Sequence, residues 1–191
     1  MKNMSNLNKL LFDACRGKVS LKEVIPSINT GLIDINQGAN DNNESTPLMI
    51  AVVEKNIEVI QFLASHKNIE INKQDKYGRT AMVHACSSGT REMVKYLLTS
   101  KDISPKPDFY YDNDYIAFKY AISFKNRDVL EYLIVDYNLT VSEEIKNFLN
   151  KYKREPELTQ EILQLINTRD LSNSLTENLI NKNLTGKTRK I

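Results

Sequence analysis

The chain has 191 residues, of which 41% are hydrophobic and 26% charged, and its formal net charge at pH 7 is +2. These are the proportions of an ordinary folded protein, and 26 basic against 24 acidic residues give none of the basic excess that is typical of nucleic-acid binding. No apolar run approaches the ~20 residues of a membrane-spanning helix. We therefore expect neither nucleic acid nor a membrane as a partner.

The N-terminus and the cysteines favour a cytoplasmic location. Residues 1–11 are polar and rich in Asn, without the apolar stretch of a secretory signal. Two cysteines are too few for a disulfide framework. Cys15 and Cys86 each follow a small alanine, so we expect two buried thiols that behave as small apolar groups.

Two short blocks of sequence recur along the chain. The first, at residues 46–51 (TPLMIA), recurs thirty-four residues later as TAMVHA and thirty-six residues after that as IAFKYA. The second begins eight residues after each copy ends, as VIQFL, MVKYL and VLEYL. A unit of this length cannot bury its own apolar face, so neighbouring units have to stack on a shared core. The repeats predict an all-α solenoid.

The first and third units show the expected internal order. In the first, Leu10 to Cys15 begin a helix, Gly17 provides a turn, and a second helix carries Leu21, Val24 and Ile25. In the third, a turn over 75–80 leads into a helix at 81–88 that Thr80 can cap. A break at Ser87–Gly89 and a second helix at 90–99 follow, and then an extended segment, a finger, leads to the next unit.

Beyond residue 140 the pattern weakens but stays helical. An apolar stripe at helical spacing runs from Ile145 to Tyr152, and the segment 162–166 (ILQLI) repeats the second block, with Pro156 in the break between the two helices. Leucines at 171, 175 and 179 mark one more helix, which we expect to shield the open end of the stack.

These residues resemble the ankyrin-repeat family. Thr46-Pro47-Leu48-x-x-Ala51 matches the signature of the family's first helix, and the segments 33–36 and 69–78 match its finger. The resemblance implies a non-enzymatic adaptor that binds a protein. It also implies an ankyrin-repeat solenoid with a helical C-terminal cap: four repeats over 1–140 (about 6–40, 41–74, 75–108 and 109–140), a divergent fifth repeat and capping helix at 141–182, and a loose basic tail at 183–191.

The chain departs from the family pattern at three kinds of position. The family's histidine before the signature alanine is replaced by Met49, Val83 and Lys119, so we expect fewer ties between fingers. The finger glycine is kept at Gly78 and replaced by Glu44 and Asp114, and the interhelix glycine is kept at Gly17 and Gly89 and replaced by Lys55 and Lys125. We expect lower stability than that of a consensus array.

Catalytic and metal chemistry have little support. His84 and Cys86 are two residues apart, so on a helix they point to different faces and make a poor nucleophile–base or metal pair. The acidic residues Asp108, Asp112 and Asp114 lack the glycine and closing glutamate of a calcium loop. We expect no catalytic residue, no metal and no cofactor.

A partner-binding surface is expected on the concave face and the finger tips, where side chains are not used for stacking. We expect His84 there as an exposed residue. Tyrosine and arginine are frequent at interface hot spots. The predicted residues are Asn42, Ile50, Lys76, Tyr77, Arg79, His84, Tyr110, Tyr111, Tyr115 and Tyr120.

Several alternatives stay open. The aromatic residues at 109–115 contact a partner or pack against residues 141–168. The chain is expected to be an adaptor for a partner protein in its own cytosol. The alternative, suggested by the Asn-, Lys- and Ile-rich sequence, is a pathogen or symbiont effector that is delivered into a host cell and acts on a host protein. We expect a monomer, with assembly through the open end as the alternative, and the sequence does not identify the partner protein.

Overall fold

The computed structural model describes residues 4–39, 43–99, 113–137, 141–152 and 156–187. Within these ranges the regular structure is helical throughout. The chain divides into two compact units, Met1–Val129 and Leu130–Ile191. None of the helices in the described ranges is long and apolar enough to cross a membrane.

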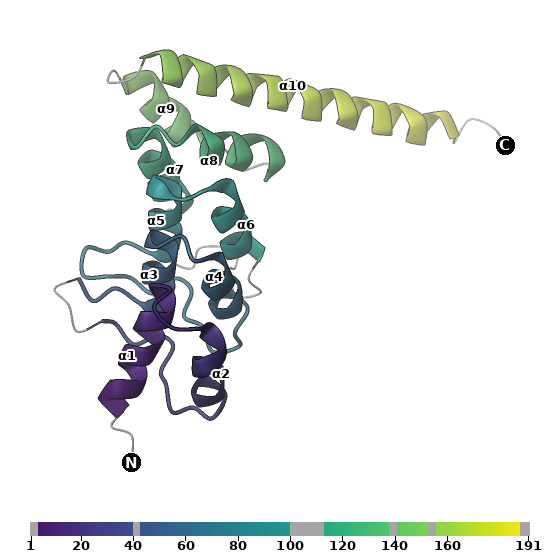
Figure 1. Ribbon diagram of the computed structural model, residues 1–191. Helices are drawn as coiled ribbons and strands as arrows, with labels where there is room; N and C mark the ends of the chain where they lie inside the picture. Colours follow the sequence, from purple (N-terminus) through teal and green to yellow (C-terminus); the bar gives the residue numbers. More distant parts are fainter. Residues whose placement is uncertain (1–3, 40–42, 100–112, 138–140, 153–155, 188–191) are drawn as a thin grey trace. The chain divides into compact units, whose positions relative to one another are not determined.

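The first unit is a stack of helix pairs (Figure 1). Within each pair one helix packs against the next, and the first helices also pack on one another in chain order, from α1 through α3 and α5 to α7. This arrangement confirms the predicted all-α solenoid. The pairs are α1 (Met4–Cys15) with α2 (Leu21–Asn29), α3 (Pro47–Val53) with α4 (Ile57–Ala64), and α5 (Ala81–Ser88) with α6 (Arg91–Thr99), followed by α7 (Asn113–Ser123) and the start of α8 (Arg127–Glu131).

One small residue in each first helix marks the line along which the stack is built. Ala14 is 1% exposed, and Ala51, Ala85 and Ala121 are completely buried. A methyl group at this position lets neighbouring helices approach closely, and a larger side chain would overpack the interface. The signature alanines therefore lie in the core, as the repeat pattern predicts.

The two cysteines are free thiols buried beside these alanines, which confirms the prediction for them. Burial raises the pKa of the Cys15 thiol to about 12. A thiol with so high a pKa carries almost no thiolate at neutral pH and is a poor nucleophile.

Threonine caps begin the first helices of the second and third pairs. The Thr46 hydroxyl accepts the Met49 N–H at 3.3 Å, and the Thr80 hydroxyl accepts the Val83 N–H at the same distance. Pro47 occupies the first turn of α3, where the missing N–H leaves no hydrogen bond unmade. The predicted cap at Thr80 is confirmed, and Thr46 caps α3 in the same way.

Three charged residues keep the backbone conformation of the glycines that they replace. Glu44, Lys55 and Lys125 have φ angles of 56°, 57° and 56°, in the left-handed region that L-residues other than glycine enter at a cost of roughly 1–2 kcal/mol. Gly89 differs, because its φ is −85° and a Cβ there would lie 2.5 Å from the Ala85 carbonyl oxygen. Its glycine is required by close packing and not by backbone angle.

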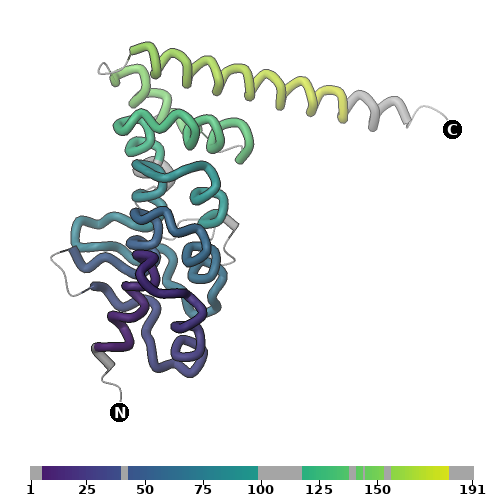
Figure 2. Tube along the Cα trace, in the orientation of Figure 1, coloured from purple at the N-terminus to yellow at the C-terminus, as the bar shows by residue number. Residues whose placement is uncertain are grey.

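Two finger segments connect the helix pairs, finger 30–46 between α2 and α3 and finger 65–80 between α4 and α5. The described parts of both fingers project to one side of the stacked helices, on the left in Figure 2. Ile33, Ile35, Ile69 and Ile71 are buried and anchor the fingers to the core. The finger of the fourth repeat falls on residues 100–112, outside the described residues.

The second unit contains η1 (Tyr132–Asp136), α9 (Glu143–Lys151) and α10 (Pro156–Lys187), and α10 packs on both of the others. The predicted helix break before Pro156 is confirmed. Ile145 and Leu149 of α9 are buried, and so are Ile162 and Ile166 of α10.

The C-terminal helix differs from the expected separate cap and loose tail. Residues 156–187 form one continuous helix of 32 residues, so residues 183–187, expected to be loose, are helical. Leu171, Leu175 and Leu179 are 66%, 64% and 63% exposed, because Leu171 lies about 140° around the helix from buried Ile166 at ~100° per residue. No proline follows Pro156 to end the helix.

Replacing Lys55 by glycine should stabilise the first unit by about 1 kcal/mol, because glycine adopts the left-handed conformation without strain. Lys125→Gly should have the same effect. Urea unfolding measures both changes.

The matched control for both variants is Lys95→Gly at an exposed position within α6. This change should destabilise the protein by about 1 kcal/mol, because glycine is a poor helix former. A loss of stability in Lys55→Gly equal to that in the control would show that the turn carries no strain.

Candidate functional site

The buried carboxylate of Asp75 organises finger 65–80. Its Oδ1 accepts the backbone N–H groups of Tyr77 and Arg79, both at 2.9 Å. Its Oδ2 accepts Nε and Nη2 of the Arg79 guanidinium, each at 2.8 Å. Burial alone would raise the pKa of the Asp75 carboxyl, but these hydrogen bonds and the positive charge of Arg79 outweigh burial and hold the pKa below its usual 3.8. The carboxylate thus fixes both the turn and the arginine.

Tyr77 stands at the tip of this turn with 60% of its surface exposed. The Arg79 guanidinium carbon lies 4.7 Å from the centre of the tyrosine ring, and Lys76 Nζ lies 5.0 Å from it. Both distances are within the range of cation–π attraction. The structure therefore brings three of the predicted site residues together in one cluster.

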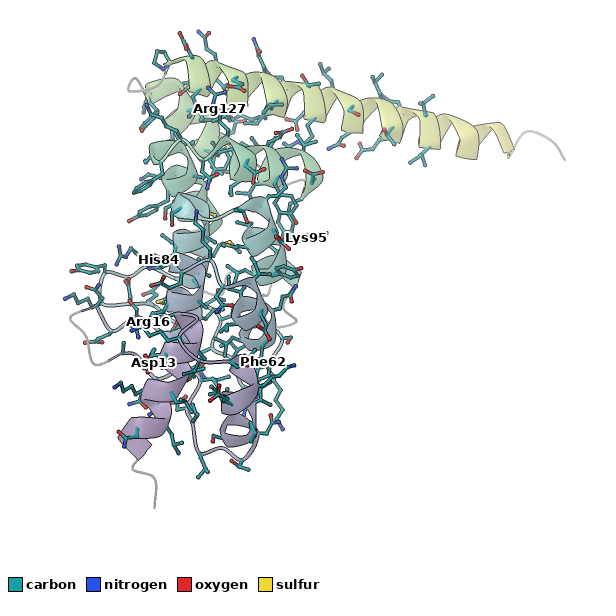
Figure 3. The ribbon with its side chains drawn as sticks, in the orientation of Figure 1. Asp13, Arg16, Phe62, His84, Lys95 and Arg127 are labelled. Carbon is teal, nitrogen blue, oxygen red and sulfur yellow. The ribbon has the colours of Figure 1, made fainter. Side chains whose placement is uncertain are left out.

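His84 lies beneath this cluster, on the side of the stack that faces the fingers (Figure 3). Its Nε2 is 3.4 Å from Asp75 Oδ2, and only 13% of its side chain is exposed. The expectation of an exposed histidine is therefore wrong. Burial lowers the pKa of His84 below 6.5, the charge of Arg79 lowers it further, and the attraction of Asp75 does not compensate. At neutral pH the ring is neutral.

Ile50 is only 8% exposed and belongs to the core, so its predicted place on the binding surface is wrong. It lies on α3, which packs against α1 on one side and α5 on the other. Neighbours on both sides cover a residue that would be accessible on a terminal helix.

Tyr120 is half-buried, and its ring stacks on Phe124 with centroids 6.2 Å apart and planes 9° apart. Phe124 is 61% exposed, and the sequence analysis missed it. The available signal was an aromatic residue at the position where the two preceding repeats have Glu54 and Ser88.

Four predicted positions cannot be placed in the same way. Asn42, Tyr110 and Tyr111 lie outside the described residues. The backbone of Tyr115 lies in α7, and its side chain is outside the described set. In the described part of the chain, no three His, Cys, Asp or Glu residues are grouped so that they could hold a metal ion.

An asparagine, and not the family's histidine, joins the two described fingers. Asn36 Nδ2 donates to the Asn68 carbonyl and Asn36 Oδ1 accepts the Glu70 N–H, both at 2.8 Å. The Lys76 N–H also donates to the Asn43 carbonyl at 3.1 Å. We expected fewer hydrogen bonds between the fingers because the family's histidine is absent. These three hydrogen bonds nevertheless join the two described fingers.

Asparagines also join successive interhelix turns. Asn56 Nδ2 donates to the Ala14 carbonyl at 3.0 Å, and Asn126 Nδ2 donates to the Cys86 and Gly89 carbonyls at 3.2 and 3.1 Å. Each side chain also caps its own second helix through Oδ1. The shared Lys-Asn dipeptide at 55–56 and 125–126 was the signal that could have found them.

Asn36→Ala should destabilise the first unit by about 1–3 kcal/mol, because it removes the two part-buried hydrogen bonds to the Asn68 carbonyl and the Glu70 N–H. Asn29→Ala, at the exposed end of α2, is the matched control and should have little effect. Urea unfolding compares the two, and equal midpoints would contradict the role of Asn36.

Stability should fall as the pH drops from about 7 toward the folded pKa of His84. That pKa lies below 6.5, so over this range the unfolded chain binds more protons than the folded chain. His84→Gln should remove this part of the pH dependence, measured as unfolding midpoint against pH. A slope unchanged by His84→Gln would contradict it, and His66→Gln, which removes the other imidazole, separates the two histidines.

Comparison with known proteins agrees with this geometry. Residues 67–144 match the family model described as "Ankyrin repeats (3 copies)", and residues 43–76 match "Ankyrin repeat". Together the two matches run from residue 43 to residue 144, more than half of the chain.

Curated relatives match over shorter segments. Human "Transient receptor potential cation channel subfamily A member 1" is 37% identical over 68 residues, which cover 34% of this chain and 6% of that protein. "Ankyrin repeat and SAM domain-containing protein 6" is 35% identical in rat and 34% in mouse over 86 residues, covering 44% of this chain and 9% of those proteins. The chain spans less than a tenth of the length of these relatives. The helix pairs, their caps and the matched models together show that the chain belongs to the ankyrin-repeat family.

Proposed function

We propose that the chain is a non-enzymatic scaffold that binds a partner protein through its concave face and finger tips. Ankyrin repeats generally mediate protein–protein interaction. The observation that carries the proposal for this chain is the exposed ring of Tyr77, which lies close to the cationic groups of Lys76 and Arg79 on a finger whose turn is fixed by the buried carboxylate of Asp75.

The residue types in this cluster, and the contacts that hold them in place, both favour it as a contact point for a partner. Tyrosine and arginine dominate interface hot spots, since they bury a large area and keep polar groups that can bond a partner. The guanidinium of Arg79 is oriented by two contacts to Asp75. Phe124, in the turn that follows α7, stacks on Tyr120 and adds a second exposed aromatic ring.

The proposed binding surface is divided among successive repeats. We infer four repeats at about 6–40, 41–74, 75–108 and 109–140, followed by a divergent fifth repeat within 141–182. The succession of helix pairs supports this division. The aromatic residues at 109–115 remain a predicted contact in the fourth repeat.

A photo-reactive amino acid placed at Tyr77 should crosslink a partner protein in extract from the native cell. The same group at Lys95 on α6 is the matched control, because Lys95 is exposed on the side of the stack away from His84 and the fingers (Figure 3). Crosslinked products are compared by mass on a denaturing gel.

A product from position 77 that is absent from position 95 supports the proposal. Equal labelling at the two positions, or none at position 77, contradicts a role for this finger. The double change Tyr110→Ala with Tyr111→Ala, in a folded protein, tests whether the fourth finger shares the contact.

A further inference from the structure

We propose that finger 65–80 binds an extended acidic segment of the partner protein. This inference rests on the proposed function and adds the chemical class of what the finger recognises. It is argued from the exposed cationic groups of the finger and from its buried carboxylate.

The finger hides its central negative charge and presents positive charge. The Asp75 side chain is completely buried, whereas 31% of the Arg79 side chain is exposed. Lys76 is exposed beside the Tyr77 ring. Glu70 is paired with Lys73 at 3.1 Å, so this acidic residue is balanced within the same finger. What remains at the tip is an exposed aromatic ring with two cationic groups near it, the ammonium of Lys76 and the partly exposed guanidinium of Arg79, which is paired with Asp75 on one side.

The arginine is oriented for a second carboxylate. Nε and Nη2 both contact Asp75 Oδ2, so Nη1 is not part of that pairing. The guanidinium also lies near the Tyr77 ring, which further restricts its motion. A carboxylate of a partner can accept from Nη1 and from the ammonium of Lys76, and charge-assisted hydrogen bonds of this kind are the stronger ones.

A nucleic acid fits this surface less well than an acidic peptide. Binding to a phosphate backbone needs a row of cations along a groove, and the described tip offers two, Lys76 and Arg79. The net charge of the chain is only +2.

The experiment is a selection of short random peptides displayed on phage against the wild-type protein, with competition by Lys76→Glu protein. We expect the recovered peptides to be enriched in Asp and Glu. A synthetic peptide of the recovered sequence is then titrated by fluorescence anisotropy. Lys76→Glu should weaken its binding by roughly tenfold, and Lys95→Glu, the same charge change on α6, should leave binding within about twofold.

The outcomes separate the inference from the proposed function. Peptides without acidic enrichment, or acidic peptides whose binding Lys76→Glu does not weaken, overturn the inference and leave the scaffold function standing. Recovery of no peptide above background counts against the proposed function and, with it, the inference. Equal weakening by Lys76→Glu and Lys95→Glu shows attraction by net charge alone and also overturns the inference. Tighter binding of a single-stranded oligonucleotide than of the acidic peptide would assign the finger to nucleic acid instead.

Discussion

Close packing between the first helices of successive pairs is the constraint on which the rest of the first unit depends. These helices have 7 to 12 residues, and isolated helices of that length are marginal in water. They persist because each buries its alanine side against a neighbour. Ala14, Ala51, Ala85 and Ala121 show at most 1% exposure. The fingers connect these stacked helices, so the helices position them. The described ranges contain no strand that could do so.

Polar side chains connect the fingers and form the turns at positions where the family signature has a histidine and glycines. Asp75 holds its own turn, and Asn36 holds the next finger. Lys55 and Lys125 accept a left-handed backbone that glycine would adopt freely, and the asparagine after each bonds back to the preceding repeat. The chain thus keeps the geometry of the family with a different set of residues.

Local signals predicted the helix pairs and the threonine cap at Thr80, because each depends on residues close in sequence. Predictions that depend on distant neighbours were weaker. Ile50 was placed on the surface, but it is buried on α3, a helix that packs against both α1 and α5. Asn36 was missed because its partners lie 32 and 34 residues away. The extent of α10 was missed because exposed leucines at helical spacing do not reveal whether one helix or two carries them.

The hydrogen bonds between fingers 30–46 and 65–80 have a consequence for how such a surface associates. Two loops that are bonded to one another have already lost much of the conformational entropy that free loops would lose when they dock. For a protein that binds through these fingers, Asn36 would then influence affinity from beneath the surface. Its loss would let the loops move independently, and complexes would dissociate faster although every contacting side chain was intact.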